Sequence, residues 1–113
     1  MIQCVMSDQK LWEILVPTVS RAGKPYRTRY HRVWDQRIRE ISSGLTIFAP
    51  SKGQWVSPDG TLLEERMIPV RFMATKDQAE KIAEFTLEYY DQLAVLCCLI
   101  SDDVIFKKRA EPC

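Results

Sequence analysis

Residues 62–90, LLEERMIPVRFMATKDQAEKIAEFTLEYY, pass from a strand pattern directly into a helix pattern, and this succession decides the fold class. Up to Met73 the run predicts a long strand, in which Ile68, Val70 and Phe72 share one face while Glu65, Met67, Arg71 and Met73 share the other. Thr75 and Gln78 then have the spacing of a capping box, the clearest helix start in the chain. The helix is predicted to end near Tyr90, and its apolar stripe comprises Ala79, Ile82, Phe85, Thr86 and Tyr89.

The first half of the chain shows the same succession of strand and helix. Residues 10–19 alternate as a strand, and after a polar loop residues 29–42 carry an apolar stripe at helical spacing. Thr28 is the predicted N-cap, and Gly44 stands where a helix commonly ends. The stripe comprises Tyr30, Trp34, Ile38 and Ile41, of which Trp34 is predicted to anchor the core.

Shorter patterns complete the order of elements. Residues 45–49 predict a short strand, residues 50–55 a loop or an irregular extension of it, and the Ser-Pro-Asp-Gly run at 57–60 a turn. Residues 93–100 predict an apolar strand and residues 104–107 a short final strand. The order β-α-β-β-α-β predicts an α+β, ferredoxin-like two-layer sandwich: an antiparallel sheet with two helices on one face and a short extra C-terminal strand. Right-handed crossovers give the strand order 4-1-3-2.

Both central strands of that order carry a proline, Pro17 in the first and Pro69 in the third. Proline donates no ladder hydrogen bond, so a bulge or a skipped bond is expected at Pro69. The length of 113 residues fits a single domain, 1–113, with residues 1–8 and 108–113 expected to be frayed.

Composition and charge narrow the classes of function. Hydrophobic residues make up 46% and charged residues 27%, and 16 basic against 15 acidic residues give a net charge of +1. This balance is that of an ordinary globular protein and argues against a surface that binds nucleic acid along its whole length. The sequence shows no signal-peptide pattern and no apolar run long enough for a bilayer, so we expect a cytoplasmic protein without a membrane segment.

The four cysteines have no spacing that suggests a metal site. Cys97 and Cys98 are adjacent in a predicted strand, so they should point to opposite faces as small buried apolar residues. Cys4 and Cys113 lie in the segments expected to be frayed. We therefore predict no metal and no cofactor.

The sheet face away from the helices has an apolar character. Its predicted side chains are Leu11, Leu15, Met67 and Met73, together with Glu13, Glu65 and Arg71. Such a face would be a large exposed apolar patch on a monomer, so we expect a homodimer that pairs sheet to sheet as a dimeric α/β barrel. Glu13 and Arg71 are candidate ligand-binding residues in the interior of that barrel; the alternative is that they are solvated cross-strand charges.

A basic segment gives a second candidate site. Residues 21–40 hold seven basic and two acidic residues, and Arg27, Arg29 and His31 fall where a loop meets the start of a helix. Guanidinium groups and the positive end of a helix both favour anions, so a small anionic ligand is expected there, with Tyr26 and Tyr30 stacking on any ring. The alternative is a solvated helix face.

One stretch carries a resemblance. The run Gly44-Leu45-Thr46-Ile47, then Gly53-Gln54-Trp55, Asp59-Gly60 and Glu64-Glu65, resembles an uncharacterised family of small bacterial α+β proteins, a domain of unknown function. Its members share a Gly-Leu-Thr-Val, Gly-Gln-Trp and Asp-Gly hairpin pattern, and many carry an export signal that this chain lacks. The resemblance implies the hairpin and the ferredoxin-like fold, and it implies no catalytic residue.

These observations favour a dimeric binding or interaction module. The alternative is a cofactor-independent dimeric α/β-barrel enzyme, of monooxygenase or isomerase type, acting on a small organic substrate, either anionic or uncharged. RNA binding ranks last, because the open face offers Leu and Met while Trp12 and Phe72 point to the helices. A deep cavity holding Glu13, Arg71 or His31 would favour the enzyme, and a filled interior would favour the module.

Overall fold

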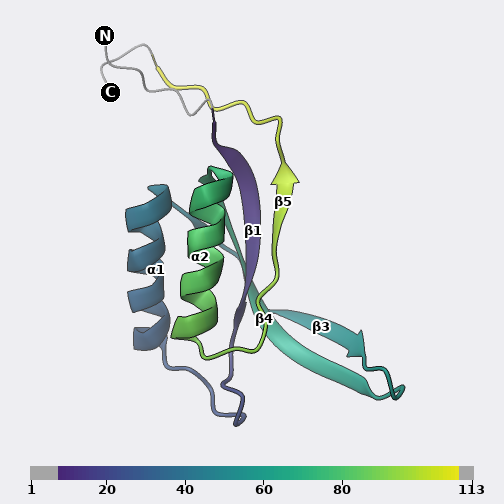
Figure 1. Cartoon of the computed structure of the whole chain (residues 1–113). Helices are drawn as coiled ribbons and strands as arrows, with labels where there is room; N and C mark the ends of the chain where they lie inside the picture. The colour runs from purple at the N-terminus through teal and green to yellow at the C-terminus, as the bar shows by residue number, and fades with distance from the viewer. Residues whose placement is uncertain (1–7, 110–113) are drawn as a thin grey trace.

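The computed structural model describes residues 8–109, which form two helices packed on one face of an antiparallel sheet (Figure 1). The elements in chain order are β1 (Lys10–Pro17), α1 (Thr28–Ser42), β2 (Thr46–Ile47), β3 (Ser51–Val56), β4 (Leu62–Ala74), α2 (Lys76–Tyr89) and β5 (Cys97–Ser101). The predicted two-layer α+β class is confirmed. The expected frayed ends, with Cys4 and Cys113, lie almost entirely outside the described residues.

The strand order is β2-β4-β1-β5, with β3 also paired to β4. Read from the other edge, this is the predicted order 4-1-3-2. In the central pair, Trp12 lies opposite Phe72 and Ile14 opposite Val70. Directly opposed residues share a face, so these four side chains lie under the helices.

The fifth strand does not come from where the sequence predicts it. Residues 104–107 form no strand, and the predicted strand at 93–100 is confined to Cys97–Ser101. The extra strand is β3, in a stretch where a loop or irregular extension is predicted, and its register with β4 is regular from Ser51 to Val56. Pairing with the long β4 holds this stretch extended although its own sequence is polar and glycine-containing.

Pro69 explains why the edge strand is split into β2 and β3. The pairing of β1 with β4 passes Pro69, opposite Leu15, without a register shift, so the expected bulge is absent from this ladder. The Pro69 carbonyl accepts a hydrogen bond from the Phe48 amide at 2.9 Å, so its backbone faces the edge. The missing proline N–H therefore falls opposite the gap between Ile47 and Ser51, where no ladder bond is needed.

The hairpin of β3 and β4 extends beyond the helical layer as an arm (Figure 1). β1 ends at Pro17, opposite Met67, so among the described strands residues 62–66 of β4 pair with β3 alone. The chain measures 57 × 29 × 23 Å, and its radius of gyration of 16.1 Å exceeds the about 13 Å expected for a compact domain of this length.

The space between helices and sheet is filled. Trp34 is 1% exposed, which confirms it as the core anchor of α1. Its indole Nε1 donates to Thr86 Oγ1 at 2.9 Å, and this hydroxyl donates onward to the Ile82 carbonyl at 2.6 Å. The buried apolar cluster comprises Ile14, Val16, Trp34, Ile38, Val70, Phe72, Ala74, Ala79, Ile82 and Tyr90.

The helix ends agree with the sequence at α2 and differ at α1. The capping box of Thr75 and Gln78 is present at α2 as predicted. At α1 the N-cap is Arg27, one residue before the predicted Thr28, and no side chain caps it. The left-handed residue after α1 is Ser43, with φ 71°, where Gly44 is expected; its amide donates to the Arg39 carbonyl.

Candidate functional site: the open sheet face

The face of the sheet away from the helices carries an ion pair among apolar side chains. Arg71 Nε donates to Glu13 Oε1 at 3.1 Å, and the guanidinium lies over the Phe48 ring, 5.1 Å from its centroid. Glu13 and Arg71 are directly opposed in the ladder, so their side chains share a face. The Glu13 side chain is 22% exposed and the Arg71 side chain 40%, so the two charges are half-buried and paired with each other through the Arg71 Nε.

Apolar residues flank this pair toward both ends of the sheet. Leu11 lies opposite Met73 on one side of the pair, and Leu15 lies opposite Pro69 on the other. Leu11, Leu15, Met67 and Met73 are all half-buried within a single copy. The predicted apolar face is thus present, although the chain shields it more than the sequence suggests.

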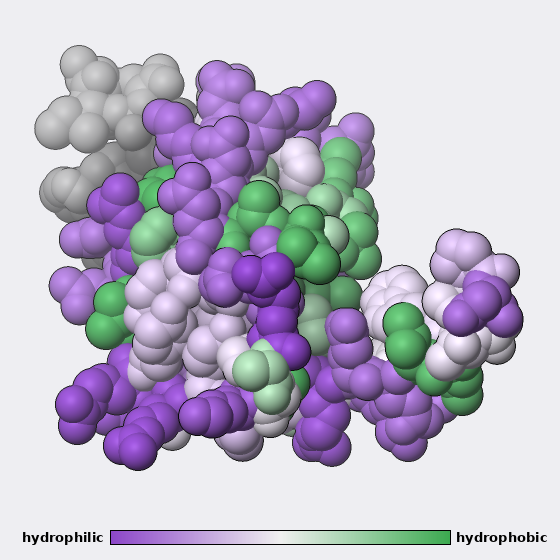
Figure 2. Space-filling model, turned by 60° about the horizontal axis from the view of Figure 1, so that its bottom comes forward, coloured by the Kyte–Doolittle hydropathy of each residue, from purple (hydrophilic) through white to green (hydrophobic). Residues whose placement is uncertain are grey.

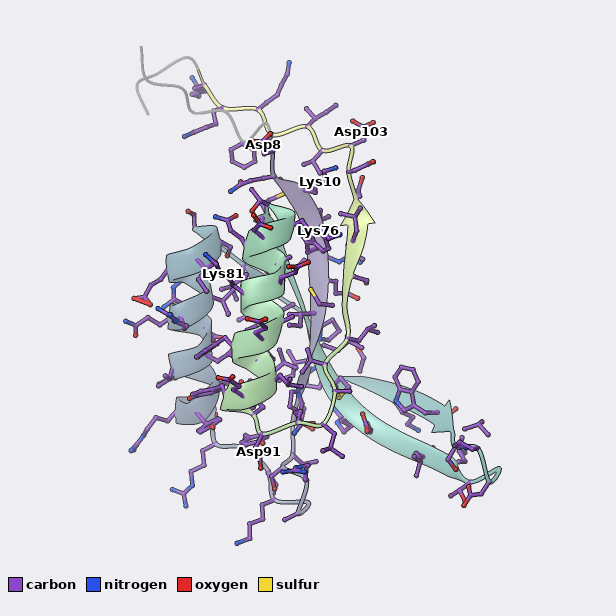
Figure 3. The ribbon with its side chains drawn as sticks, in the orientation of Figure 1. Asp8, Lys10, Lys76, Lys81, Asp91 and Asp103 are labelled. Atoms are coloured by element: carbon purple, nitrogen blue, oxygen red, sulfur yellow. The ribbon has the colours of Figure 1, made fainter. Side chains whose placement is uncertain are left out.

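A small pocket opens at the end of this face where β1 begins. It has a volume of about 230 Å³ and lies between Leu11, Met73 and Arg71 of the sheet and residues 42–46, which run from the end of α1 to the start of β2. Phe106, from the segment that follows β5, forms another part of its wall. The labelled side chains of Lys10 and Asp103 mark this end of the molecule (Figure 3).

At the other end the face continues onto the arm. Trp55 is opposed to Leu63, and Ser51 to Met67, so by strand alternation Trp55 and Leu63 lie on the same side as Met67. Trp55 is 46% and Leu63 48% exposed. Figure 2 shows apolar surface on the arm at the right of the view.

The conformation of the arm corrects two predictions. Gly53 is not a bulge, because the register continues through it opposite Glu65. Trp55 does not cap the core; its ring lies across Gly53, where an added Cβ would stand 3.4 Å from Trp55 Nε1. Because Gly53 has no side chain, the Trp55 ring can lie this close to the backbone of the arm.

The start of α1 does not gather the predicted anion-binding residues on one surface. Arg27 and Arg29 are exposed, whereas His31 turns inward, with its Nδ1 2.6 Å from the hydroxyl of the fully buried Tyr90. The structure therefore separates the six candidate residues into two places. Glu13 and Arg71 lie on the open sheet face, and Arg27, Arg29, Tyr30 and His31 lie at the α1 start, on the other side of the sheet.

The tyrosines of this region pack on one another. The Tyr30 ring stacks on Tyr26 at 5.0 Å and on Tyr89 at 4.2 Å between centroids. The Tyr26 hydroxyl donates to the Tyr90 carbonyl at 2.6 Å, and the Tyr89 hydroxyl donates to the Tyr30 carbonyl at 2.8 Å. These bonds tie the start of α1 to the end of α2. Of the two rings expected to stack on a ligand, Tyr30 is already stacked on two protein rings and Tyr26 on one.

Burial sets the protonation of this cluster. It lowers the pKa of the His31 imidazole, an effect that nearby Asp35 opposes. Burial also raises the pKa of the Asp35 carboxyl, against the opposing charges of Arg39 and His31, and raises the pKa of the Tyr90 phenol strongly. The cluster thus favours a neutral imidazole beside a neutral phenol.

The same end of the molecule carries an ion pair on its surface. Arg21 Nη2 donates to both carboxylate oxygens of Asp91, at 3.0 and 2.9 Å. Figure 3 labels Asp91 just beyond the end of α2. Because both side chains are largely exposed, this pair contributes little to stability.

The two adjacent cysteines divide between the faces, as their alternation predicts. Cys97 lies opposite Ile14 on the helix side and Cys98 opposite Glu13 on the open face. Both are half-buried, which is less than the full burial expected. Burial raises the pKa of the Cys97 thiol to about 11, so this thiol is largely un-ionised at neutral pH.

No group of three or more His, Cys, Asp or Glu side chains in residues 8–109 is placed to hold a metal ion. Within the same range, no helix has both the length and the apolar character needed to cross a membrane.

Comparison with solved structures gives the class of fold. The chain is similar to the periplasmic divalent cation tolerance protein CutA from Archaeoglobus fulgidus, with a TM-score of 0.65, 12% identity and 88% of each chain covered. It is also similar to the divalent cation tolerance protein from Thermus thermophilus, with a TM-score of 0.60, 12% identity, and 85% of this chain and 87% of that one covered.

A third similar structure is that of an enzyme, a phage SAM lyase in complex with S-methyl-5′-thioadenosine. Its TM-score is 0.61 at 11% identity, with 86% of this chain and 84% of that one covered. At these identities the likeness shows the ferredoxin-like fold, and proteins with different functions share that fold.

No family model and no curated protein matches the chain. The fold implied by the Gly-Gln-Trp hairpin pattern is confirmed, and the resemblance itself stays a prediction.

The sequence patterns did not single out Phe48 and Phe106. Phe48 falls in a predicted strand that ends earlier, and Phe106 in a predicted strand that does not form. The sequence showed only that each of these two short segments contains a phenylalanine. The packing of the folded chain is what brings Phe48 and Phe106 close to Arg71.

Proposed function

We propose that the chain is a self-associating binding module in which a second copy covers the open sheet face and the arm surface that continues it. The observation that carries the proposal is the position of Trp55 and Leu63. Both side chains are about half exposed, and they lie on an arm that projects beyond the helical layer. They lie on the same face of the sheet as Met67, which is the open face.

Several features support a second copy as the occupant. The helices cover only one face of the sheet, so the same apolar surface is present on every copy and can pair with itself. The net charge of +1 produces little repulsion between copies. Glu13 and Arg71 form an ion pair at 3.1 Å, so a second copy that covers them encloses no isolated charge.

The filled helix–sheet layer favours a binding module over the enzyme alternative. The space under the helices holds the apolar cluster around Trp34 and Ile14. His31, the one histidine, is hydrogen-bonded to buried Tyr90. An acid–base role needs the imidazole within reach of a substrate. Detected turnover of a small organic substrate would contradict this preference for a binding module.

The test compares two neighbouring leucines on opposite faces of the arm. Leu63→Arg places a charge on the side of the open sheet face, and Leu62→Arg makes the same change on the other side, where Leu62 is 56% exposed. Burying half a leucine is worth about 1 kcal/mol. In a symmetric pair the loss counts twice, so Leu63→Arg should weaken association about 30-fold.

Sedimentation velocity and native mass spectrometry at micromolar concentration give the readout. We expect wild type and Leu62→Arg to associate and Leu63→Arg to be shifted to monomer. A wild type that remains a 13.2 kDa monomer on increasing concentration contradicts the proposal, as does equal association of both variants. Two of the similar structures are named as divalent cation tolerance proteins. If this chain binds such a cation, native mass spectra recorded with added Zn²⁺ will show the mass of the bound ion.

A further inference from the structure

The pocket at the end of the open sheet face has the composition of a site for an amphiphilic anion. Its volume of about 230 Å³ is bounded by the apolar side chains of Leu11, Leu45, Met73 and Phe106. Arg71 is the one basic side chain in its lining among residues 8–109. An apolar chamber of about 150 Å³ accepts a benzene molecule, so this pocket has room for one ring and a small polar group.

Arg71 is held in place and still has donors to offer. Its Nε is occupied by Glu13, and the Phe48 ring lies beneath the guanidinium. Among residues 8–109, neither Nη group has a hydrogen-bond partner, and the side chain is 40% exposed. The two Nη groups of a fixed guanidinium match the two oxygens of a carboxylate.

The surroundings of the pocket favour a ligand with a single negative charge. Glu13 is ionically paired beside the guanidinium, and its carboxylate repels further anionic charge. The pocket also borders Ser42, Ser43 and Gly44, where the carbonyl end of α1 carries partial negative charge. A second carboxylate on the ligand would be repelled by the Glu13 carboxylate and by the carbonyl end of α1.

We propose that this pocket binds a small monocarboxylate with an apolar body, the carboxylate on the Arg71 Nη groups and the body between Leu11, Met73 and Phe106. The inference goes beyond the proposed self-association by naming a chemical class of ligand. All of the residues belong to one copy, so the site does not depend on a second one.

The probe is benzoate, titrated into the full chain by calorimetry and by chemical-shift mapping. Benzamide has the same shape without the charge, and terephthalate adds a second carboxylate. We expect benzoate to bind saturably in the millimolar range or better, at least tenfold more tightly than either analogue, with shifts confined to the pocket. Absence of saturable benzoate binding, or benzamide binding as tightly, overturns the proposal.

Three variants distinguish a specific contact with the Arg71 guanidinium from a general effect of the protein's charge. Arg71→Met keeps the apolar stem and should weaken benzoate at least tenfold, whereas Arg32→Met, an exposed arginine on α1, should not change it. Glu13→Gln should tighten benzoate, because the competing negative charge is removed. Unchanged affinity in Arg71→Met contradicts the assignment.

A second variant guards against a folding defect. Phe106 is 56% exposed and lies outside helices and strands, so Phe106→Ala should fold normally and lose benzoate affinity. Normal affinity in that variant overturns the proposed position of the apolar body. Titration of the monomeric Leu63→Arg variant distinguishes the two proposals, because benzoate binding should persist there whether or not the wild type associates.

Discussion

The hydrogen bond from Trp34 to Thr86 gives the sharpest test of the core. Trp34 is 1% and Thr86 0% exposed, and the indole Nε1 donates to the hydroxyl at 2.9 Å. Thr86→Val keeps the side-chain shape and removes the acceptor. The buried indole N–H then has no partner, and we expect the free energy of unfolding to fall by about 1–3 kcal/mol.

A double-mutant cycle isolates that bond from the packing around it. In a Trp34→Phe background no N–H is present, so Thr86→Val should cost less than about 1 kcal/mol. The difference between the two costs, about 1–2 kcal/mol, is the coupling energy of the pair. Trp34→Ala should cost about 3–5 kcal/mol, a large share of the about 5–15 kcal/mol that stabilises a typical domain.

Urea unfolding followed by circular dichroism measures each free-energy change, with Trp55→Ala as the matched control. Trp55 is 46% exposed on the arm, so the same truncation there should cost less than about 1 kcal/mol. An equal cost of Thr86→Val in both backgrounds would place the Trp34 N–H on another acceptor. A cost of Trp34→Ala below about 1 kcal/mol would place Trp34 outside the core.

Two further predictions concern α2 and the histidine cluster. Thr75→Ala removes the hydroxyl that accepts from the Gln78 amide at 3.2 Å and should cost about 1 kcal/mol in the same assay, whereas Thr75→Ser should cost much less; equal losses would show that the cap contributes nothing. Burial lowers the pKa of His31 in the folded state, so stability should be constant above about pH 6.5 and fall as the pH decreases below that value toward the lowered pKa. Asp35 acts in the opposite direction at lower pH, because its raised pKa returns stability as the carboxyl is protonated. Urea midpoints of wild type and His31→Gln between about pH 7.5 and pH 5.5 check this: the variant should lose less stability, and parallel curves would contradict the role of His31.

The secondary structure that the sequence predicts correctly has local causes. The capping box at Thr75 needs only three residues in succession, and the stripe through Trp34 needs only helical spacing. Alternation divides each of β1 and β4 into two faces, and it places Glu13 opposite in direction to Ile14 and Arg71 opposite in direction to Val70. These features are fixed within one helix turn or one strand, so they can be predicted from the sequence.

The errors occur where a distant partner decides the conformation. Residues 51–56 look polar and irregular in the sequence, yet they form a strand because β4 extends beyond β1 and offers them an edge. Residues 104–107 have strand-like composition and form no strand, and Phe106 lines a pocket with Leu11 and Met73 instead. Sequence composition could not have distinguished these two cases.

The candidate sites show the same division. From the sequence, Arg27, Arg29 and His31 look like one basic cluster, because they lie within five residues of one another. In the folded chain His31 turns to the hydroxyl of Tyr90, fifty-nine residues away, while the two arginines stay exposed.

The sequence by itself determined the two helices and the four strands that follow the order 4-1-3-2, the two-layer class, the buried face of each helix and the apolar character of the open sheet face. Only the tertiary structure decided the split edge strand, the projecting arm and the pocket at Arg71. The reason is physical: periodicity and caps express interactions between near neighbours, whereas strand pairing and pocket walls depend on which distant segments the folded backbone brings into contact.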